Sequence, residues 1–243
     1  MPLIDLANPT RFLVLVDRLL PWLAAAALIT FAFGISQIIG APDDYQQGAT
    51  VKIMFIHVPA AWLAMGCWTV MTIASLGTLV WRHPLADVAA KAAAPLGAGF
   101  TAICLITGML WGRPTWGTYW VWDGRLTSVL VLFLMYLGVI ALWRTIEEPA
   151  RAARAAAVLT LVGAINVPII KFSVDWWSTL HQPASVLRLG GPTIHPSLLT
   201  PLLVMAVGYL LLFLTLHLAA MRNEIMRRRV RTMLMMQAET AGR

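Results

Sequence analysis

Charge is scarce in this chain, and acidic charge is the scarcest. Only 12% of the 243 residues are charged and just 11 are Asp or Glu, whereas 59% are hydrophobic. The mean hydropathy is +0.75. Because an average soluble domain has roughly 25% charged residues, this composition excludes a soluble domain of ordinary type and indicates a protein that lies in lipid.

Cysteine and nucleotide-binding motifs are nearly or wholly absent. The two cysteines, Cys67 and Cys104, both fall inside long apolar runs, where a reduced cysteine acts as a small apolar filler, so no disulfide framework is expected. The sequence contains no Gly-Lys-Ser or Gly-Lys-Thr, and therefore lacks the Walker loop that cradles phosphate. If ATP hydrolysis drives any step, a separate protein must supply it.

Six apolar runs approach or exceed the roughly 20 residues that a helix needs to cross the hydrocarbon core. We therefore predict an all-α, polytopic membrane protein with six transmembrane helices in a single domain over residues 1–243. The first run follows arginines, as in a secretory signal, but it is long enough to span and we expect it to be retained. The expected spans are about 19–39, 53–81, 92–110, 126–143, 155–170 and 198–220.

The basic residues predict the orientation of these spans. Thirteen of the 18 Lys and Arg residues precede the first span, follow the last, or lie in the loops after the second and fourth spans. Because basic loops stay in the cytoplasm, we expect both termini to be cytoplasmic. The net charge of +7 is spread between apolar runs, which favours contact with membrane lipid and no nucleic-acid partner.

The remaining loops, about 41–52, 111–125 and 171–197, would then lie on the outer side of the membrane. The second of them is densely aromatic, with Trp111, Trp116, Tyr119, Trp120 and Trp122 within twelve residues. Any one of these fits an interfacial aromatic belt. Their clustering beside glycines, which let a backbone approach a ligand closely, favours a surface for a flat, apolar ligand.

The sequence leaves the local structure of this segment and the contacts of Asp123 open. If it folds as a short interfacial helix, Trp116 and Trp120 share one face, Asp123 continues it, and the indoles form a plane. Asp123 also directly precedes the fourth span, where it could cap the helix or pair with Arg125. Gly108 forms a G-x-x-x-G with Gly112, which suits close helix approach or packing within the bundle.

The stretch Trp116-Gly117-Thr118-Tyr119-Trp120-Val121-Trp122-Asp123 resembles the W-G-x-x-W-x-W-D signature of the haem-handling WWD family of cytochrome c biogenesis proteins. The six-span length and the following Gly124-Arg125-Leu126-Thr127 look most like the CcmC-type members. The resemblance implies a periplasmic haem platform made of Trp111, Trp116, Gly117, Tyr119, Trp120, Trp122 and Asp123.

Two histidines match the positions at which the family pattern places axial haem ligands, one in each outer segment flanking the motif. These are His57, near the outer end of the second span, and His181, before the last span. Taken alone, each is more typical of an interfacial hydrogen-bonded histidine. His195 is a weaker candidate, because Ile194-His195-Pro196 suggests a turn entering the last helix.

Further polar residues are assigned to the ligand or to a partner. Arg113 and Arg125 are placed to meet haem propionates. In the first outer loop, Asp44, Gln47 and Lys52 resemble residues associated with engaging a haem chaperone, although any solvated loop carries such residues and Lys52 could reach a propionate or simply snorkel to the interface.

The resemblance implies that a b-type, non-covalent haem is bound at the periplasmic face and delivered to a CcmE-type chaperone. A CcmD-type small membrane protein and CcmA/CcmB-type ABC transporter components would be neighbours. The chain has no C-x-x-C-H for attaching haem to itself. No residue need act as a general acid or base, so we expect a delivery protein and not an enzyme.

Two alternatives stay open from the sequence. One is an ABC-type permease subunit without a haem site, whose outer tryptophans serve only as a belt. The other is a synthetase that joins haem to apocytochrome c, although such family members are larger and have more spans.

Overall fold

The computed structural model describes residues 7–177 and 179–241, and over these residues the regular structure is helical apart from one isolated bridge between Asp44 and Gly48. Six segments are long and apolar enough to cross a membrane, as predicted; η2 and α2 together form one of them, and α5 and α6 another. The elements are α1 (Pro9–Gly40), η2 (Ala49–Ile53), α2 (Met54–Leu79), α3 (Ala86–Trp116), α4 (Gly124–Thr145), α5 (Pro149–Gly163), α6 (Asn166–Trp176) and α7 (Pro196–Ala241).

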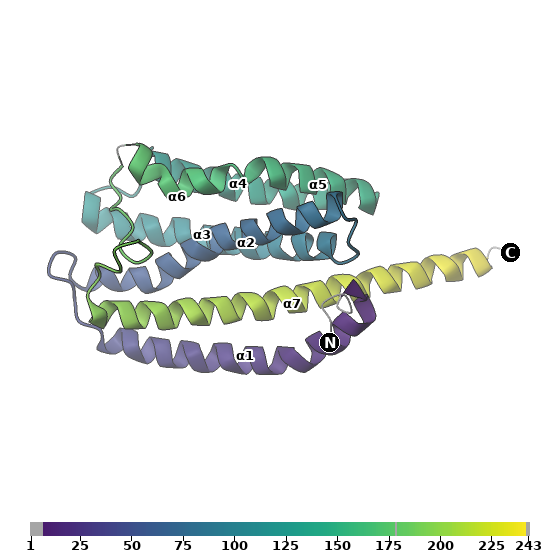
Figure 1. Ribbon diagram of the computed structural model, residues 1–243, viewed down its shortest axis with the longest axis horizontal. Coiled ribbons are helices and arrows are strands. Elements are labelled where there is room, and N and C mark those ends of the chain that lie inside the picture. Colours follow the sequence, from purple (N-terminus) through teal and green to yellow (C-terminus); the bar gives the residue numbers. More distant parts are fainter. Residues whose placement is uncertain (1–6, 178, 242–243) are drawn as a thin grey trace.

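Several helices extend well beyond the apolar runs that predict them. Helix α1 begins at Pro9, ten residues before the expected span, where the side chain of Asn8 accepts a hydrogen bond from the Thr10 amide at 2.9 Å. Helix α7 has 46 residues, and at about 1.5 Å per residue it is roughly 69 Å long, against a hydrocarbon core of about 30 Å. Its C-terminal part projects past the rest of the bundle (Figure 1).

The fifth membrane segment is divided into α5 and α6 at Ala164 and Ile165. Pro168 has no amide hydrogen to donate to the Ala164 carbonyl, and its ring crowds that carbonyl. The turn is tightened instead, with the Val167 amide donating to the Ala164 carbonyl at 3.2 Å. The expected span of 155–170 is therefore shorter than the observed segment, Pro149–Trp176, and the break at the proline lies inside it.

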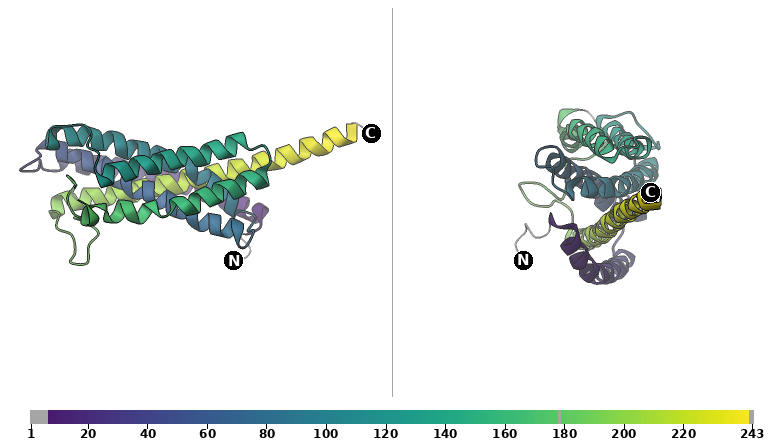
Figure 2. Two further views of the ribbon diagram at one scale, coloured as in Figure 1. Left: turned by 90° about the horizontal axis from the view of Figure 1, so that it is seen from above. Right: turned by 90° about the vertical axis from the view of Figure 1, so that its right-hand side faces the viewer.

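The helices lie in layers (Figures 1 and 2). Helices α4, α5 and α6 form one side, α2 and α3 lie in the middle, and α7 separates them from α1, which packs mainly on α7. The start of α1 and the far end of α7 lie at the same end of the bundle, here called the basic end. The opposite end, which carries residues 41–53, 117–123, 177 and 179–195, is called the cavity end.

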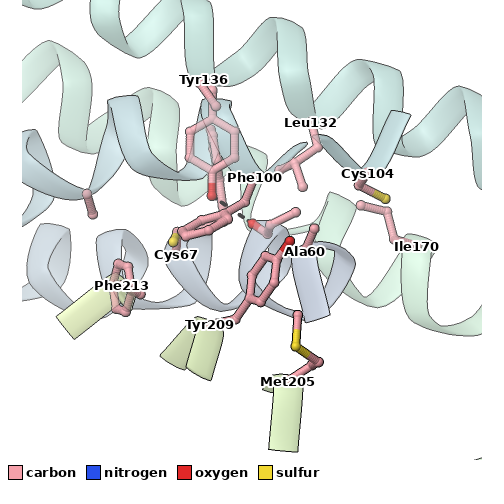
Figure 3. Close-up of a cluster of buried hydrophobic side chains, with 14 of the residues drawn as sticks. Ala60, Cys67, Phe100, Cys104, Leu132, Tyr136, Ile170, Met205, Tyr209 and Phe213 are labelled. Carbon is pink, nitrogen blue, oxygen red and sulfur yellow. Dashed lines mark hydrogen bonds between the residues drawn. The ribbon is translucent and has the colours of Figure 1, made fainter. Parts of the chain in front are cut away.

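The middle of the bundle is closely packed around Trp68 and Tyr136. Their rings meet edge to face with centroids 4.8 Å apart. The Tyr136 hydroxyl donates to the Ala64 carbonyl at 2.7 Å, and the Trp68 indole N–H donates to the Thr160 carbonyl at 3.1 Å. Figure 3 shows Tyr136 pointing from α4 toward Cys67 and Phe100.

Glycine permits this packing, because a Cβ at Gly97 would lie 2.2 Å from the Tyr136 ring. Cys67 and Cys104 are both buried and unpaired, as expected. The well-packed middle forms a floor beneath the cavity end.

Candidate functional site

A cavity of about 590 Å³ opens at the cavity end, which is within the range of roughly 300–1,000 Å³ typical of small-molecule and cofactor sites. Its walls come from the segment between α1 and α2, from α2, α3, α4 and α6, from the stretch before α7 and from the start of α7. His57 and His181 both line it, although 124 positions separate them in sequence. The structure thus brings the two predicted ligands to one cavity. The other predicted site residues that line this cavity are Asp44, Gln47, Trp111, Trp116, Trp120 and Arg125.

His57 lies in the first turn of α2 and is held by α3. Its Nδ1 is 3.1 Å from the hydroxyl oxygen of Thr107, and its ring meets Trp111 edge to face at 5.7 Å between centroids. The Nε2 atom has no hydrogen-bond partner among the described residues. One nitrogen of the ring is therefore engaged, and the other is available to the cavity that the side chain lines.

His181 lies in the irregular segment before α7 and is held by the aromatic motif. Its Nδ1 is 3.2 Å from Asp123 Oδ2, and its ring meets Trp116 edge to face at 4.8 Å. Because a carboxylate accepts hydrogen bonds, Nδ1 carries the proton and Nε2 keeps the lone pair, as in metal-binding histidines oriented by a carboxylate. Burial lowers the pKa of His181 below its ordinary value, while Asp123 opposes that shift.

Asp123 combines two contacts, one on each carboxylate oxygen. Oδ1 accepts from the Leu126 amide at 2.7 Å and so caps α4, while Oδ2 meets His181. The capping interpretation of the sequence is confirmed. The neighbouring Arg125 donates through Nε to the hydroxyl of Ser173 at 3.2 Å instead, and it lines the cavity.

The short helix that the sequence allowed, with Trp116, Trp120 and Asp123 on one face, does not form. Helix α3 ends at Trp116 because Gly117 takes a left-handed conformation, with φ 78°, and residues 117–123 are not helical. The indoles do not form one plane either, since Trp120 and Trp122 meet at 78°.

The aromatic residues of the motif fall into two groups, those that line the cavity and those that do not. Trp111, Trp116 and Trp120 line it. The indole N–H of Trp120 is buried and has no hydrogen-bond partner in the part of the chain that the structure describes. By contrast, Tyr119 and Trp122 are exposed, with 53% and 75% of their surface accessible, and neither lines the cavity.

The predicted polar residues outside the cavity have local partners. Arg113 donates to the Gly117 carbonyl and lies over the Tyr119 ring, 5.6 Å from its centroid. Lys52 forms an ion pair with Asp43 at 3.4 Å. Neither of these two side chains lines the cavity, unlike Arg125.

Asp44 and Gln47 order the loop between α1 and α2. Asp44 Oδ1 accepts hydrogen bonds from the amides of Gln46 and Gln47, both at 2.9 Å. The side-chain oxygen of Gln47 accepts from the Trp111 indole N–H at 2.7 Å. Their contacts tie this loop to α3, and both residues also reach the wall of the cavity.

Sequence reasoning missed the residues of α3 that support the site. Thr107 contacts His57, and a Cβ at Gly108 would lie only 3.0 Å from the His57 ring. A Cβ at Gly112 would similarly lie 3.1 Å from the Trp116 ring. The G-x-x-x-G motif was visible in the sequence, but its meaning was not. In the structure these two glycines leave room for the rings of His57 and Trp116. His195 contacts Ser197 at 2.8 Å at the start of α7 and does not line the cavity.

Comparison with known proteins gives consistent matches along the chain. A family model described as "CcmC: Heme exporter protein C" matches residues 2–236. A protein named Heme exporter protein C from Bradyrhizobium diazoefficiens is 75% identical over 238 residues, covering 98% of this chain and 90% of that protein. The protein of the same name from Escherichia coli K12 is 46% identical over 223 residues, covering 91% and 90%. The one from Paracoccus denitrificans is 45% identical over 235 residues, covering 96% and 98%.

Proposed function

The chain belongs to the Heme exporter protein C family, and from this premise we propose that it binds one haem in the cavity and delivers it to a soluble-domain partner. The ligands to the iron are His57 and His181. The membrane is the bacterial inner membrane, with the cavity end facing the periplasm. The recipient is a CcmE-type haem chaperone, and CcmD-type and CcmA/CcmB-type proteins are its neighbours in the assembly.

One observation carries this proposal: two histidines from distant segments line the same cavity, and each has its Nδ1 engaged while its Nε2 is unpartnered among the described residues. Iron takes an imidazole through a nitrogen lone pair. The surrounding residues fit a porphyrin, since three indoles supply apolar contact area and Arg125 supplies a cation for a propionate.

The site suits delivery better than catalysis. A haem between His57 and His181 would lie against Trp111, Trp116 and Trp120 at the end of the bundle, close to the exposed Trp122 and Tyr119. The protein's contribution is to orient the porphyrin edge toward the partner, which makes the subsequent reaction effectively unimolecular. Exchangeable, non-covalent binding is consistent with this role.

The proposal is tested by the absorption spectrum of the full-length protein purified in lipid nanodiscs, with and without a CcmE-type chaperone. We expect a Soret band that shifts or diminishes when the chaperone removes haem. His57→Ala and His181→Ala should each weaken haem binding by at least tenfold, because each removes one ligand to iron. A permease subunit without a haem site would instead be colourless.

His195→Ala is the matched control, because His195 also lies at the cavity end but contacts Ser197 and does not line the cavity. It should leave the spectrum unchanged. If a variant lacking both His57 and His181 keeps the wild-type spectrum, the ligand assignment is wrong.

A further inference from the structure

The hydroxyl of Thr107 has only one proton, and the surrounding acceptors determine where it goes. Its oxygen lies 2.6 Å from the Ile103 carbonyl, one turn earlier in α3, and 3.3 Å from the carbonyl of Cys104. Both are acceptors only. The hydroxyl therefore donates into its own helix, and toward His57, at 3.1 Å, it acts as an acceptor.

An acceptor at this position selects one form of the imidazole ring. Nδ1 of His57 must carry the hydrogen that it donates to Thr107, so in the neutral ring the lone pair is on Nε2. We propose that Thr107 is the positioning residue for His57, fixing the tautomer and ring orientation in which Nε2 can bind the haem iron. This inference rests on the proposed function, because it concerns one of the two ligands assigned there.

The neighbouring residues of α3 hold the same ring in place. A Cβ at Gly108 would lie 3.0 Å from Cε1 and 3.6 Å from Nδ1 of His57, so the ring occupies the space that glycine leaves empty. Trp111, one turn after Thr107, meets the ring edge to face. The Thr107 hydroxyl, the space left by Gly108 and the Trp111 indole all belong to α3. Together they fix the direction of the His57 side chain on α2.

His181, the other proposed ligand, is also protonated at Nδ1, but a different group holds it. His181 donates from Nδ1 to the carboxylate of Asp123, whereas His57 donates to a neutral hydroxyl. A charged acceptor raises the basicity of an imidazole more than a neutral one does. The two ligands are therefore inequivalent, and the Thr107 contact is the weaker and more easily tested of the two.

The first test reads the tautomer without haem. Full-length protein with ¹⁵N-labelled histidine in nanodiscs should give, for His57, the nitrogen shifts of a ring protonated at Nδ1. Thr107→Val keeps the shape and removes the hydroxyl acceptor, leaving the Cys104 carbonyl as the other acceptor near the ring, so the share of His57 protonated at Nε2 should rise, while Thr107→Ser should keep the wild-type pattern. Unchanged His57 shifts in Thr107→Val would overturn the inference.

The second test reads ligation in the haem-loaded protein by absorption and electron paramagnetic resonance. Thr107→Val should bind haem about 10–100-fold more weakly, the usual cost of losing a group that orients a metal ligand, and should show a larger high-spin ferric fraction. Gly108→Ala should act in the same direction by displacing the ring. Thr107→Ser should restore the low-spin signal.

The matched control is Thr101→Val on the same helix. The Thr101 hydroxyl donates to the Gly97 carbonyl at 2.6 Å, and Thr101 does not line the cavity. This variant should bind haem like the wild type. If Thr107→Val also binds haem normally while His57→Ala does not, the positioning role is wrong and the proposed function stands. If His57→Ala itself has no effect, both fail.

Discussion

At the basic end of the bundle, opposite charges from different helices pair with one another, whereas at the cavity end two cavity-lining histidines each keep one nitrogen without a protein partner among the described residues. Glu224 of α7 meets Lys91 of α3 at 2.8 Å and Arg228 at 2.9 Å, and Arg228 also pairs with Asp87 at 2.8 Å. At the cavity end, Nε2 of both His57 and His181 has no partner among the described residues.

This difference distinguishes the contacts that hold the helices together from the side chains that are available to a ligand. Ion pairs between α3 and α7 fix the two helices against each other at one end. At the other end, the same α3 supplies Trp111 and Trp116 to a cavity. Substitutions at the basic end should therefore change stability and spare haem binding, and those at the cavity end should do the reverse.

The largest effect on stability is expected for Glu224→Ala. The Glu224 side chain is only 11% exposed and contacts Lys91, Arg227 and Arg228. Removing one partner from a buried pair costs about 3–5 kcal/mol, and because these cations are partly exposed, solvent screening reduces the expected loss to roughly 2–4 kcal/mol. Unfolding by SDS in mixed micelles measures it. If folded Glu224→Ala lost haem binding, the two ends would not have separate roles in stability and ligand binding.

Asp123→Asn should have the largest effect at the cavity end after loss of a histidine. Its Oδ1 can still cap α4, so the free energy of unfolding should change by less than about 0.5 kcal/mol. Its amide nitrogen, however, would place a donor against Nδ1 of His181 and favour the wrong tautomer. Haem binding should weaken about 10–100-fold.

Haem titration of the purified protein measures this change. Asp123→Ala is the comparison variant, because it also removes the cap and should cost a further 1 kcal/mol or so of stability. Equal haem affinity in Asp123→Asn and wild type would show that the carboxylate does not orient His181.

The apolar runs of the sequence predicted the six membrane segments, but they could not predict where the helices end. Helix α7 continues from the apolar run through Arg222 and Arg229 to Ala241. Arg, Met, Leu, Glu and Gln are good helix formers in water, and no Gly or Pro lies between Tyr209 and Ala241. The hydropathy pattern marks where the lipid ends, whereas a helix can continue in water wherever its residues favour helix and no breaker occurs.

The histidines of the candidate site could be selected from the sequence, but their supporting residues could not. His57 and His181 stand out because they match the positions at which the family pattern places axial histidines, one in each outer segment flanking the aromatic motif. Thr107 contacts His57 only because α2 and α3 pack with a particular rotation, and a one-residue rotation would present another side chain. Such contacts depend on packing between helices, which local sequence does not specify.

Trp120→Phe should have a smaller effect, confined to the cavity end. The Trp120 indole N–H is buried and unpartnered in the described part of the chain, and an unpaired buried donor costs free energy. Removing it should leave the protein at least as stable. If haem supplies the missing acceptor, haem binding should weaken about 3–10-fold, the value of one hydrogen bond. Unchanged affinity in the haem titration would mean that this N–H does not contact the ligand.

The smallest effect is expected for Lys52→Gln, which tests the outer boundary of the site. Lys52 pairs with Asp43 at 3.4 Å, its side chain is 31% exposed, and it does not line the cavity. An exposed ion pair contributes about 0–1 kcal/mol, so haem affinity should change by less than about twofold, whereas Arg125→Gln should weaken binding several-fold more because Arg125 lines the cavity. The same haem titration compares them. A tenfold loss in Lys52→Gln would place Lys52 at a propionate and extend the ligand site over the first outer loop.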